Sequence, residues 1–391
     1  MENTVKEQID KIAREAARQL RELAHPSMQQ RCRNRVKRAL GRPGYSGDLI
    51  FWPAGLLMLG LLEAGELQVI EDYLTEWTGK GMPVLNPDDA LTGVVLQRLY
   101  QATGKEVYRE GAEKILSYLE HCRKDATGSI VYGQRSQNSW IYADGVGQTA
   151  MFYAQMGELE KAGRELRNFA AYGMDEASNL PYHGYDAKSG SCYGIIGWGR
   201  AVGWLMLGLS SYQAAGKLQS ADQTSAAGSA EKGTGNVGQR TTAQKERTAC
   251  EQDQSVRSMC GALVSSVMKR RREDGLFSWQ LDCRKGPLDT SASGMICYSM
   301  LKGGFLQEVS GDSDDLDRTA EDSCSCGTYG ICDHGDIYDE FAEALLAQVD
   351  PEGRVLQSSA ECIDFAQYRQ QYGCNPWGQG AVLAYLAAWQ R

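Results

Sequence analysis

The sequence predicts an all-α protein in which helical hairpins form a ring, with their loops gathered at one end of an α/α barrel. Apolar residues recur at three- and four-residue spacings along most of the 391 positions, whereas strand patterns are scarce. Loops that combine glycine, aromatic residues and an Asp or His return along the chain with a helix pair between them. This weak repeat indicates the ring of hairpins.

The expected helices follow one another from the N-terminus. The first covers residues 5–23, where Ile12 and Leu20 share one face. Another covers residues 89–102 and ends near Gly104, because glycine favours the left-handed conformation that ends many helices. The recurring loops lie at residues 125–128, 182–185, 273–279 and 350–353.

One domain is expected over residues 1–391, interrupted by a segment of different composition. Residues 218–256 are rich in Ser, Thr, Gln, Ala and Gly and nearly free of large apolar residues. Such a segment cannot bury enough surface to offset the entropy cost of ordering it. We therefore interpret it as a flexible low-complexity insertion between two core helices, and the apolar pattern resumes at residues 259–268.

Composition and charge limit the location and the partners. Hydrophobic residues make up 42% and charged residues 23%, the balance of a soluble globular protein, and no run approaches the roughly 20 apolar residues that span a bilayer. Residues 1–8 lack the apolar region of a secretory signal, so we expect a cytoplasmic protein with reduced cysteines. A net charge of −9 argues against nucleic-acid and membrane partners, and we expect a monomer or small homo-oligomer.

Acidic residues at expected loop-to-helix junctions are the first candidates for chemistry. Asp88 and Asp89 precede one helix, and Asp144 begins another after the aromatic run that contains Trp140 and Tyr142. Each Asp could simply cap its helix, since Asp is a favoured N-cap. Apolar neighbours can also raise the pKa of a carboxyl, as a general acid requires, which singles out Asp144.

Aromatic clusters with one histidine and one arginine are the second candidates. His183 lies between two tyrosines, and Trp198, Arg200 and Trp204 follow. Aromatic faces stack on sugar rings and an Arg fork binds a carboxylate, although a packed aromatic core would look the same. A third cluster, Tyr45 and Trp52, could line a sugar site or fill the core.

No metal or organic cofactor is expected. Cys324, Cys326, Cys332 and His334 cluster, but their spacing matches no closed zinc pattern. The chain also lacks a phosphate-binding glycine loop, a dinucleotide fingerprint and a nucleophile elbow.

Several motifs, taken in order, resemble those of the unsaturated rhamnogalacturonyl hydrolases, glycoside hydrolase family 105, whose relatives are the unsaturated glucuronyl hydrolases of family 88. The resemblance implies an (α/α)6 barrel that hydrates the C4=C5 double bond of a terminal unsaturated uronic acid and thereby releases it from a short acidic oligosaccharide derived from pectin. The motifs lie at residues 88–93, 99–104, 140–144, 182–185, 198–204 and 289–295.

The resemblance also implies roles for individual residues. Asp144 would donate the proton and activate the water, while Asp88, or alternatively Asp89, would assist or orient the sugar. His183 would bind the uronyl sugar and Arg200 its carboxylate or a hydroxyl. Arg135 stands where the family has basic residues and would bind the substrate. Aromatic side chains would stack on the sugar or bind it; they are Trp52, Trp204, Trp198, Trp140 and Tyr45.

Three other functions stay open at this point. A glucuronyl hydrolase that acts on glycosaminoglycan fragments would use the same residues. A sugar epimerase would need a pair of acid and base groups, typically histidines, and the expected site has one. In a non-catalytic sugar-binding barrel, Asp144 would be only a helix cap.

Overall fold

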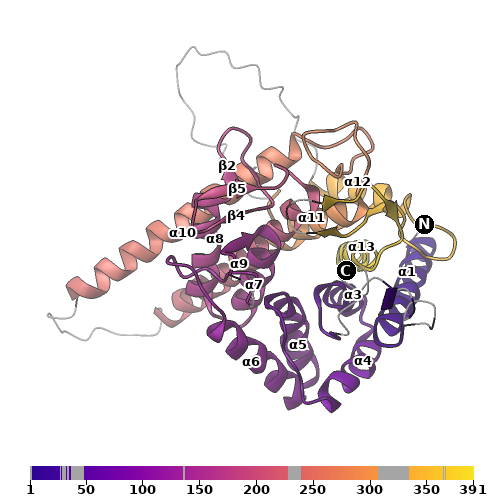
Figure 1. The fold of residues 1–391 in the computed structure, drawn as a ribbon, viewed down its shortest axis with the longest axis horizontal. Helices are drawn as coiled ribbons and strands as arrows, with labels where there is room; N and C mark the ends of the chain where they lie inside the picture. The colour runs from indigo at the N-terminus through magenta and orange to yellow at the C-terminus, as the bar shows by residue number, and fades with distance from the viewer. Residues whose placement is uncertain are drawn as a thin grey trace, which may run out of the picture.

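The computed structural model describes residues 2–26, 28, 32, 35–36, 48–134, 137–227, 239–306, 334–363, 365 and 367–391. Helices dominate this part of the chain and form two concentric rings (Figure 1). Each hairpin contributes one inner and one outer helix. The expectation of an (α/α)6 barrel is confirmed.

The inner ring consists of six helices, each packed on the next, and the last closes on the first. Each inner helix from α3 to α11 is followed by an outer helix that returns along the outside, and the last inner helix, α13, packs against the first outer helix, α1. They are α3 (Trp52–Glu63), α5 (Ala90–Thr103), α7 (Ala143–Gln155), α9 (Gly199–Ala227), α11 (Thr290–Gly303) and α13 (Pro376–Trp389).

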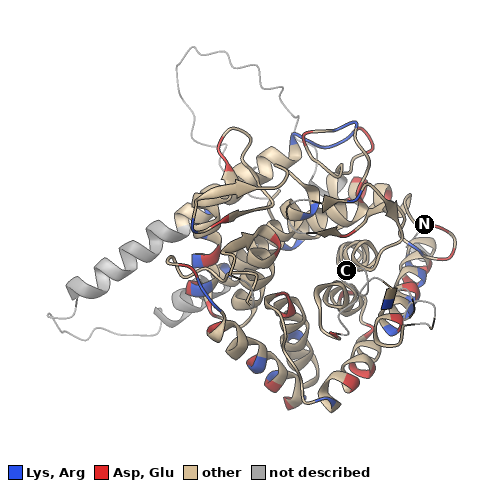
Figure 2. Ribbon diagram, viewed as in Figure 1, with Lys and Arg blue, Asp and Glu red and all other residues tan. Residues whose placement is uncertain are grey.

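The outer ring consists of helices that each pack against one or two inner helices. Figure 2 shows Lys, Arg, Asp and Glu residues along the outer helices α1, α4 and α6. The outer helices are α1 (Glu2–Ala24), α4 (Leu67–Gly79), α6 (Glu106–His121), α8 (Leu159–Tyr172), α10 (Gln239–Met268) and α12 (His334–Leu346).

Burial explains which helices lie inside. An inner helix has neighbours all round, and in α13 every residue from 377 to 387 is buried. An outer helix buries one stripe, which in α8 consists of Ala162, Gly163, Glu165, Leu166 and Phe169. The uniformly apolar segments of the sequence therefore form the inner ring, and the amphipathic segments form the outer one.

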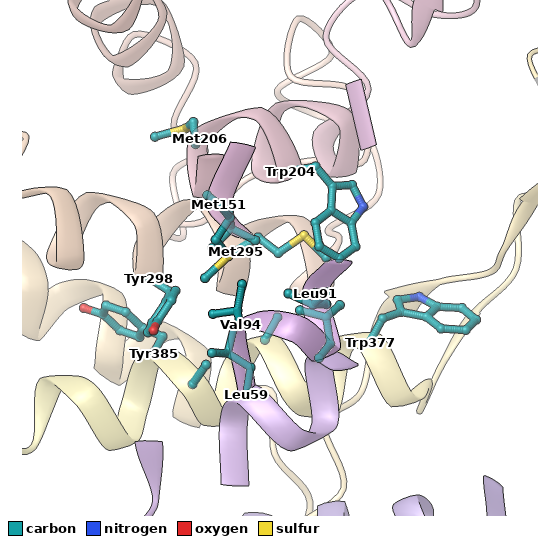
Figure 3. Packing of buried hydrophobic residues seen from close by; sticks show 14 of the residues in the cluster. Leu59, Leu91, Val94, Met151, Trp204, Met206, Met295, Tyr298, Trp377 and Tyr385 are labelled. Carbon is teal, nitrogen blue, oxygen red and sulfur yellow. The ribbon is translucent and has the colours of Figure 1, made fainter. Parts of the chain in front are cut away.

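The core lies at the centre of the inner ring, where side chains from all six helices meet. Close approach of the helices depends on glycine: a Cβ at Gly147 of α7 would lie 2.1 Å from the carbonyl oxygen of Trp204 on α9. Figure 3 shows the meeting side chains, among them Leu59, Leu91, Val94, Met151, Trp204, Met206, Met295, Tyr298, Trp377 and Tyr385.

Short strands occupy the loops at one end of the barrel. β1 (Trp140–Tyr142), β4 (Gly184–Asp186) and β5 (Ser191–Tyr193) form an antiparallel sheet in that order, with Tyr142 opposite Gly184. The remaining pairs are β2 (Met174–Asp175) with β3 (Leu180–Pro181), β6 (Ser358–Ser359) with β9 (Tyr372–Gly373), and β7 (Cys362–Ile363) with β8 (Gln367–Tyr368).

The expected insertion falls partly on helix ends. Residues 218–227 belong to α9 and residues 239–256 to α10, while 228–238 lie outside the described residues. The insertion's flexibility and the single-domain organisation stay predictions. None of the helices in the described ranges is both long and apolar enough to span a bilayer.

Candidate active site

The N-terminal ends of four inner helices, α3, α5, α7 and α9, converge on a pocket of about 240 Å³. Trp52 begins α3, Asp144 and Arg200 are the second residues of α7 and α9, and Asp88 lies in the 3-10 turn η1 (Pro87–Asp89) that leads into α5. Helix N-termini carry partial positive charge and unsatisfied N–H groups, so this end of the barrel favours an anionic ligand.

Seven of the residues predicted for the site line this pocket, and seven others complete it. The predicted ones are Trp52, Asp88, Asp144, His183, Trp198, Arg200 and Trp204. The others are Phe51, Tyr132, Tyr142, Gln148, Glu361, Cys362 and Ile363.

Asp88 is the buried carboxyl group of the pocket, with 2% of its surface exposed. The Tyr132 hydroxyl donates a hydrogen bond of 2.7 Å to Oδ2, and Gln148 Nε2 lies 3.4 Å from Oδ1. The pKa of Asp88 is raised to about 7, chiefly by burial; the hydrogen bond from Tyr132 opposes this rise, and the nearby Asp144 and Asp48 charges add to it. Asp88 is therefore partly protonated at neutral pH.

Asp144 has a different environment. Its side chain is 19% exposed, and Oδ2 lies 2.8 Å from Nε2 of the buried His183. Pairing of β1 with β4 brings the two together, because it places His183 beside the start of α7, where the Ala143 N–H donates to the His183 carbonyl oxygen at 2.9 Å. Tyr142, not Asp144, occupies the N-cap position of α7.

Asp89 points away from the pocket. Its Oδ2 accepts hydrogen bonds from the backbone N–H groups of Leu85 (2.8 Å) and Asn86 (3.2 Å), as part of a capping box at η1. Burial and the neighbouring Asp48 raise the pKa of Asp89 well above its ordinary value. Of the two adjacent carboxyl groups, only Asp88 reaches the pocket.

Arg200 joins the pocket to the C-terminal segment 358–373. Its Nη1 donates to the carbonyl and hydroxyl oxygens of Ser359 (3.0 and 3.1 Å), and Nη2 donates to the Ala360 carbonyl oxygen (3.1 Å). The guanidinium also lies over the rings of Trp198 and Trp377, at 4.7 and 5.4 Å from their centroids. Arg200 thus holds one wall of the pocket in place, and its expected contact with a substrate carboxylate stays a prediction.

The aromatic side chains differ in what they expose. Trp52 is partly exposed and packs edge-on against Trp204, whereas Trp198 and Trp204 are buried. Trp140 lies outside the pocket, with its ring against Tyr142 and Phe365. The predicted residues Tyr45 and Arg135 lie outside the described residues.

Two buried polar atoms at the pocket wall have no hydrogen-bond partner within the described structure. They are Oε1 of Gln148 and Nε1 of Trp198. Buried polar atoms are normally paired, so this wall of the pocket holds one acceptor and one donor that depart from the rule in the described structure.

Sequence reasoning missed two kinds of pocket residue. Gln148 lies one helical turn after Asp144, and Tyr142 belongs to the aromatic run already singled out, so local spacing could have identified both. Residues 361–363 carry no local signal, because they reach the pocket only through the return of the chain near its C-terminus.

The described ranges contain no group of three or more His, Cys, Asp and Glu side chains arranged to hold a metal ion. The Cys324, Cys326 and Cys332 cluster lies outside these ranges, as does the side chain of His334. The expectation of a metal-free and cofactor-free site therefore stays a prediction.

Comparison with known proteins gives matches over more than half of the chain. Residues 9–218 match the family model described as Glycosyl Hydrolase Family 88. The chain is 23% identical over 363 residues to the unsaturated rhamnogalacturonyl hydrolase YesR of Bacillus subtilis (strain 168), an alignment that covers 86% of this chain and 88% of the relative.

Solved structures share the fold. A possible member of the GH105 family from Salmonella enterica superposes with a TM-score of 0.70 at 15% identity, covering 100% of this chain and 94% of that one. An unsaturated glucuronyl hydrolase specific for heparin superposes with a TM-score of 0.60 at 11% identity, covering 98% of this chain and 97% of that one.

Proposed function

Because the chain belongs to glycosyl hydrolase family 88 and is a glycosidase, we propose that it releases a terminal 4,5-unsaturated uronic acid from a short oligosaccharide derived from rhamnogalacturonan. The observation that carries the proposal is one pocket in which two of the three lining carboxyl groups have different environments, Asp88 buried and Asp144 partly exposed, with Glu361 the third. The name of the Bacillus relative, an unsaturated rhamnogalacturonyl hydrolase, supports the rhamnogalacturonyl substrate.

The chemistry follows from the substrate. Its C4=C5 double bond is joined to the ring oxygen and forms an enol ether. A proton from Asp144 adds to C4 and leaves an oxocarbenium ion at C5. Water adds to C5 and returns a proton to Asp144, after which the hemiketal opens and the aglycone departs. This reaction requires no nucleophilic carboxylate, in contrast to the displacement used by retaining glycosidases.

The other pocket residues bind and orient the sugar in this proposal. Asp88 in its protonated form tolerates the nearby uronate, whereas an ionised Asp88 would repel it. The helix N-termini supply positive potential for the same carboxylate. Trp52 offers an aromatic face, while His183 orients Asp144 and contacts the sugar.

The competing functions have less support. The one histidine among the pocket-lining residues, His183, does not make the acid and base pair of an epimerase. Asp144 is not the N-cap of α7, which weakens the interpretation of a non-catalytic barrel. A glucuronyl hydrolase would use the same pocket and differ beyond the scissile bond, so the substrate must be decided by assay. We expect the reaction to occur in the cytoplasm, as a step of pectin breakdown.

The test follows the ultraviolet absorbance of the conjugated double bond during incubation with the unsaturated rhamnogalacturonan disaccharide. We expect the absorbance to fall with the wild-type protein and to persist with Asp144→Asn. An unsaturated glucuronyl disaccharide is the parallel substrate. If both substrates keep their absorbance with the wild-type protein, the proposed activity is wrong.

A further inference from the structure

His183 lies between two hydrogen-bonding groups that come from distant parts of the chain. Its Nε2 is 2.8 Å from Asp144 Oδ2, and its Nδ1 is 2.8 Å from the hydroxyl of Tyr368, which lies on β8 in the C-terminal segment 358–373. The Tyr368 hydroxyl oxygen also accepts a hydrogen bond of 3.3 Å from the Ile195 backbone N–H. Three segments thus meet at one imidazole ring.

These contacts favour one position for each proton. The Ile195 N–H can only donate, so the Tyr368 oxygen accepts there, and Nδ1 is the partner in the described structure that can receive the Tyr368 proton. Burial raises the pKa of the Tyr368 phenol, which therefore keeps this proton. With Nδ1 acting as the acceptor, a neutral His183 carries its proton on Nε2 and donates it to Asp144.

We infer that Tyr368 is a positioning residue, which holds His183 in the Nε2–H tautomer and thereby assigns the two oxygens of Asp144 to different tasks. Oδ2 is occupied by the imidazole N–H. Oδ1 has no hydrogen-bond partner in the described structure, and it is the oxygen that exchanges the proton with the substrate. The catalytic part of this inference rests on the proposed function.

Packing around Tyr368 supports a fixed position. Its ring lies against Trp198 and Trp279, with centroids 5.5 and 5.7 Å away. At Gly194, a Cβ would lie 2.5 Å from both the Tyr368 hydroxyl and the His183 Cβ, and φ is +84°. Glycine is therefore required for the close approach that joins the three segments.

The chain contains an internal reference for the tautomer. His121 Nδ1 lies 2.7 Å from the Ser117 carbonyl oxygen, which can only accept, so this ring carries a proton on Nδ1. The sequence has four histidines, and the His183→Gln variant identifies the signal of His183. Side-chain ¹⁵N spectra distinguish the two neutral tautomers and the charged ring directly.

The experiment compares Tyr368→Phe with Tyr372→Phe, which removes a hydroxyl from the same segment that bonds only to the exposed Gln370. At neutral pH and without substrate, we expect the Nε2–H tautomer for His183 in the wild-type protein and in Tyr372→Phe. In Tyr368→Phe we expect a mixture that includes the Nδ1–H tautomer. We also expect kcat to fall about tenfold, the effect of roughly one lost hydrogen bond, with KM changed less than twofold.

The outcomes separate this inference from the proposed function. An Nδ1–H or charged His183 in the wild-type protein, or an unchanged tautomer and kcat in Tyr368→Phe, would overturn the inference. The wild-type spectrum decides the tautomer even if Tyr368→Phe fails to fold. If the wild-type protein leaves every unsaturated uronide intact, the proposed function is wrong, and the spectra still decide whether Tyr368 sets the tautomer of His183.

Discussion

The two ends of the barrel each bury a carboxyl group, and they treat it in opposite ways. Glu63 ends α3 at the far end, 1% exposed, with Arg98, Lys302 and Arg391 nitrogens 2.8, 3.4 and 3.5 Å from its oxygens. Burial alone would raise the pKa of Glu63, but Arg98 and the other cations outweigh burial and lower it.

Asp88 lies at the pocket end and is buried to a similar degree. Its hydrogen-bond partners Tyr132 and Gln148 are neutral, however, and the nearby charges are carboxylates. Its pKa is raised to about 7. The far end also contains the helix C-termini, which favour cations. The contrast shows that the far end compensates its buried charge for stability, while the pocket end keeps Asp88 buried with neutral hydrogen-bond partners, so that it can exchange a proton or meet a substrate.

The largest effect should come from Asp144→Asn. Loss of the proton donor is expected to lower kcat about 1,000-fold or more, because the amide cannot transfer a proton to C4. The midpoint of thermal unfolding should change by no more than about 3 °C, since Asp144 does not cap α7. The absorbance assay and a thermal melt measure both. If the variant is instead partly unfolded, and its activity per folded molecule equals that of the wild type, the role of Asp144 is structural.

Glu63→Gln tests the other end. The substitution removes the carboxylate that pairs with the largely buried Arg98. The free energy of unfolding should therefore fall by about 3 kcal/mol. We expect kcat to stay within twofold of the wild type at a temperature where the variant is folded. The matched control is Glu352→Gln, an exposed partner of Arg354, which should cost less than about 1 kcal/mol. Urea titration measures both variants, and equal costs would contradict the comparison.

Asp88→Asn should lower kcat/KM by about tenfold or less, the effect of roughly one altered hydrogen bond, because the neutral amide does not repel the anionic substrate, and it should not destabilise the protein at pH 8. The amide cannot ionise, so the folded state no longer bears a buried charge at that pH. Urea titration at pH 8 should therefore give a free energy of unfolding equal to or above that of the wild type. A clear loss of stability would show that Asp88, like Glu63, is mainly structural.

The pH dependence of stability sharpens the comparison, because the pKa shifts of the two carboxyl groups have opposite signs. The pKa of Asp88 is raised from 3.8 to about 7, so its contribution to stability is complete below pH 3.8 and is lost as the pH rises through 7. The advantage of Asp88→Asn over the wild type should grow between about pH 4 and 7 and then level off.

The pKa of Glu63 is lowered, so its contribution is complete above about pH 4.5 and is lost as the pH falls through the lowered pKa. The deficit of Glu63→Gln should accordingly shrink below that pH. Urea titrations at a series of pH values measure both trends, and parallel curves would contradict the assigned pKa directions.

The smallest effect is expected for Tyr132→Phe. The Tyr132 hydrogen bond lowers the pKa of Asp88, so its removal should move that pKa upward. An ionised Asp88 repels the anionic substrate, and kcat/KM should therefore fall above neutral pH in the wild type and at a higher pH in the variant. The pH profile of kcat/KM measures the shift, and a shift to lower pH would contradict the assignment.

Much of the fold and part of the site could be predicted from the sequence. Helical periodicity reports which faces are buried and sufficed for the all-α class, while the returning loops indicated the ring of hairpins. The local order of residues also placed Asp88, Asp144 and Trp52 at helix starts, because junction residues and the first helical turn are adjacent in the chain.

Other features depended on the tertiary structure. The backbone of η1, and not composition, turns Asp88 into the pocket and Asp89 onto the N–H groups of residues 85 and 86. The contact of Tyr368 with His183 joins residues 185 positions apart, and that of Arg200 with Ser359 joins residues 159 positions apart. Periodicity encodes burial but not partners, so only the closure of α13 on α3 brings the C-terminal segment 358–373 against the pocket and Tyr368 within hydrogen-bond distance of His183.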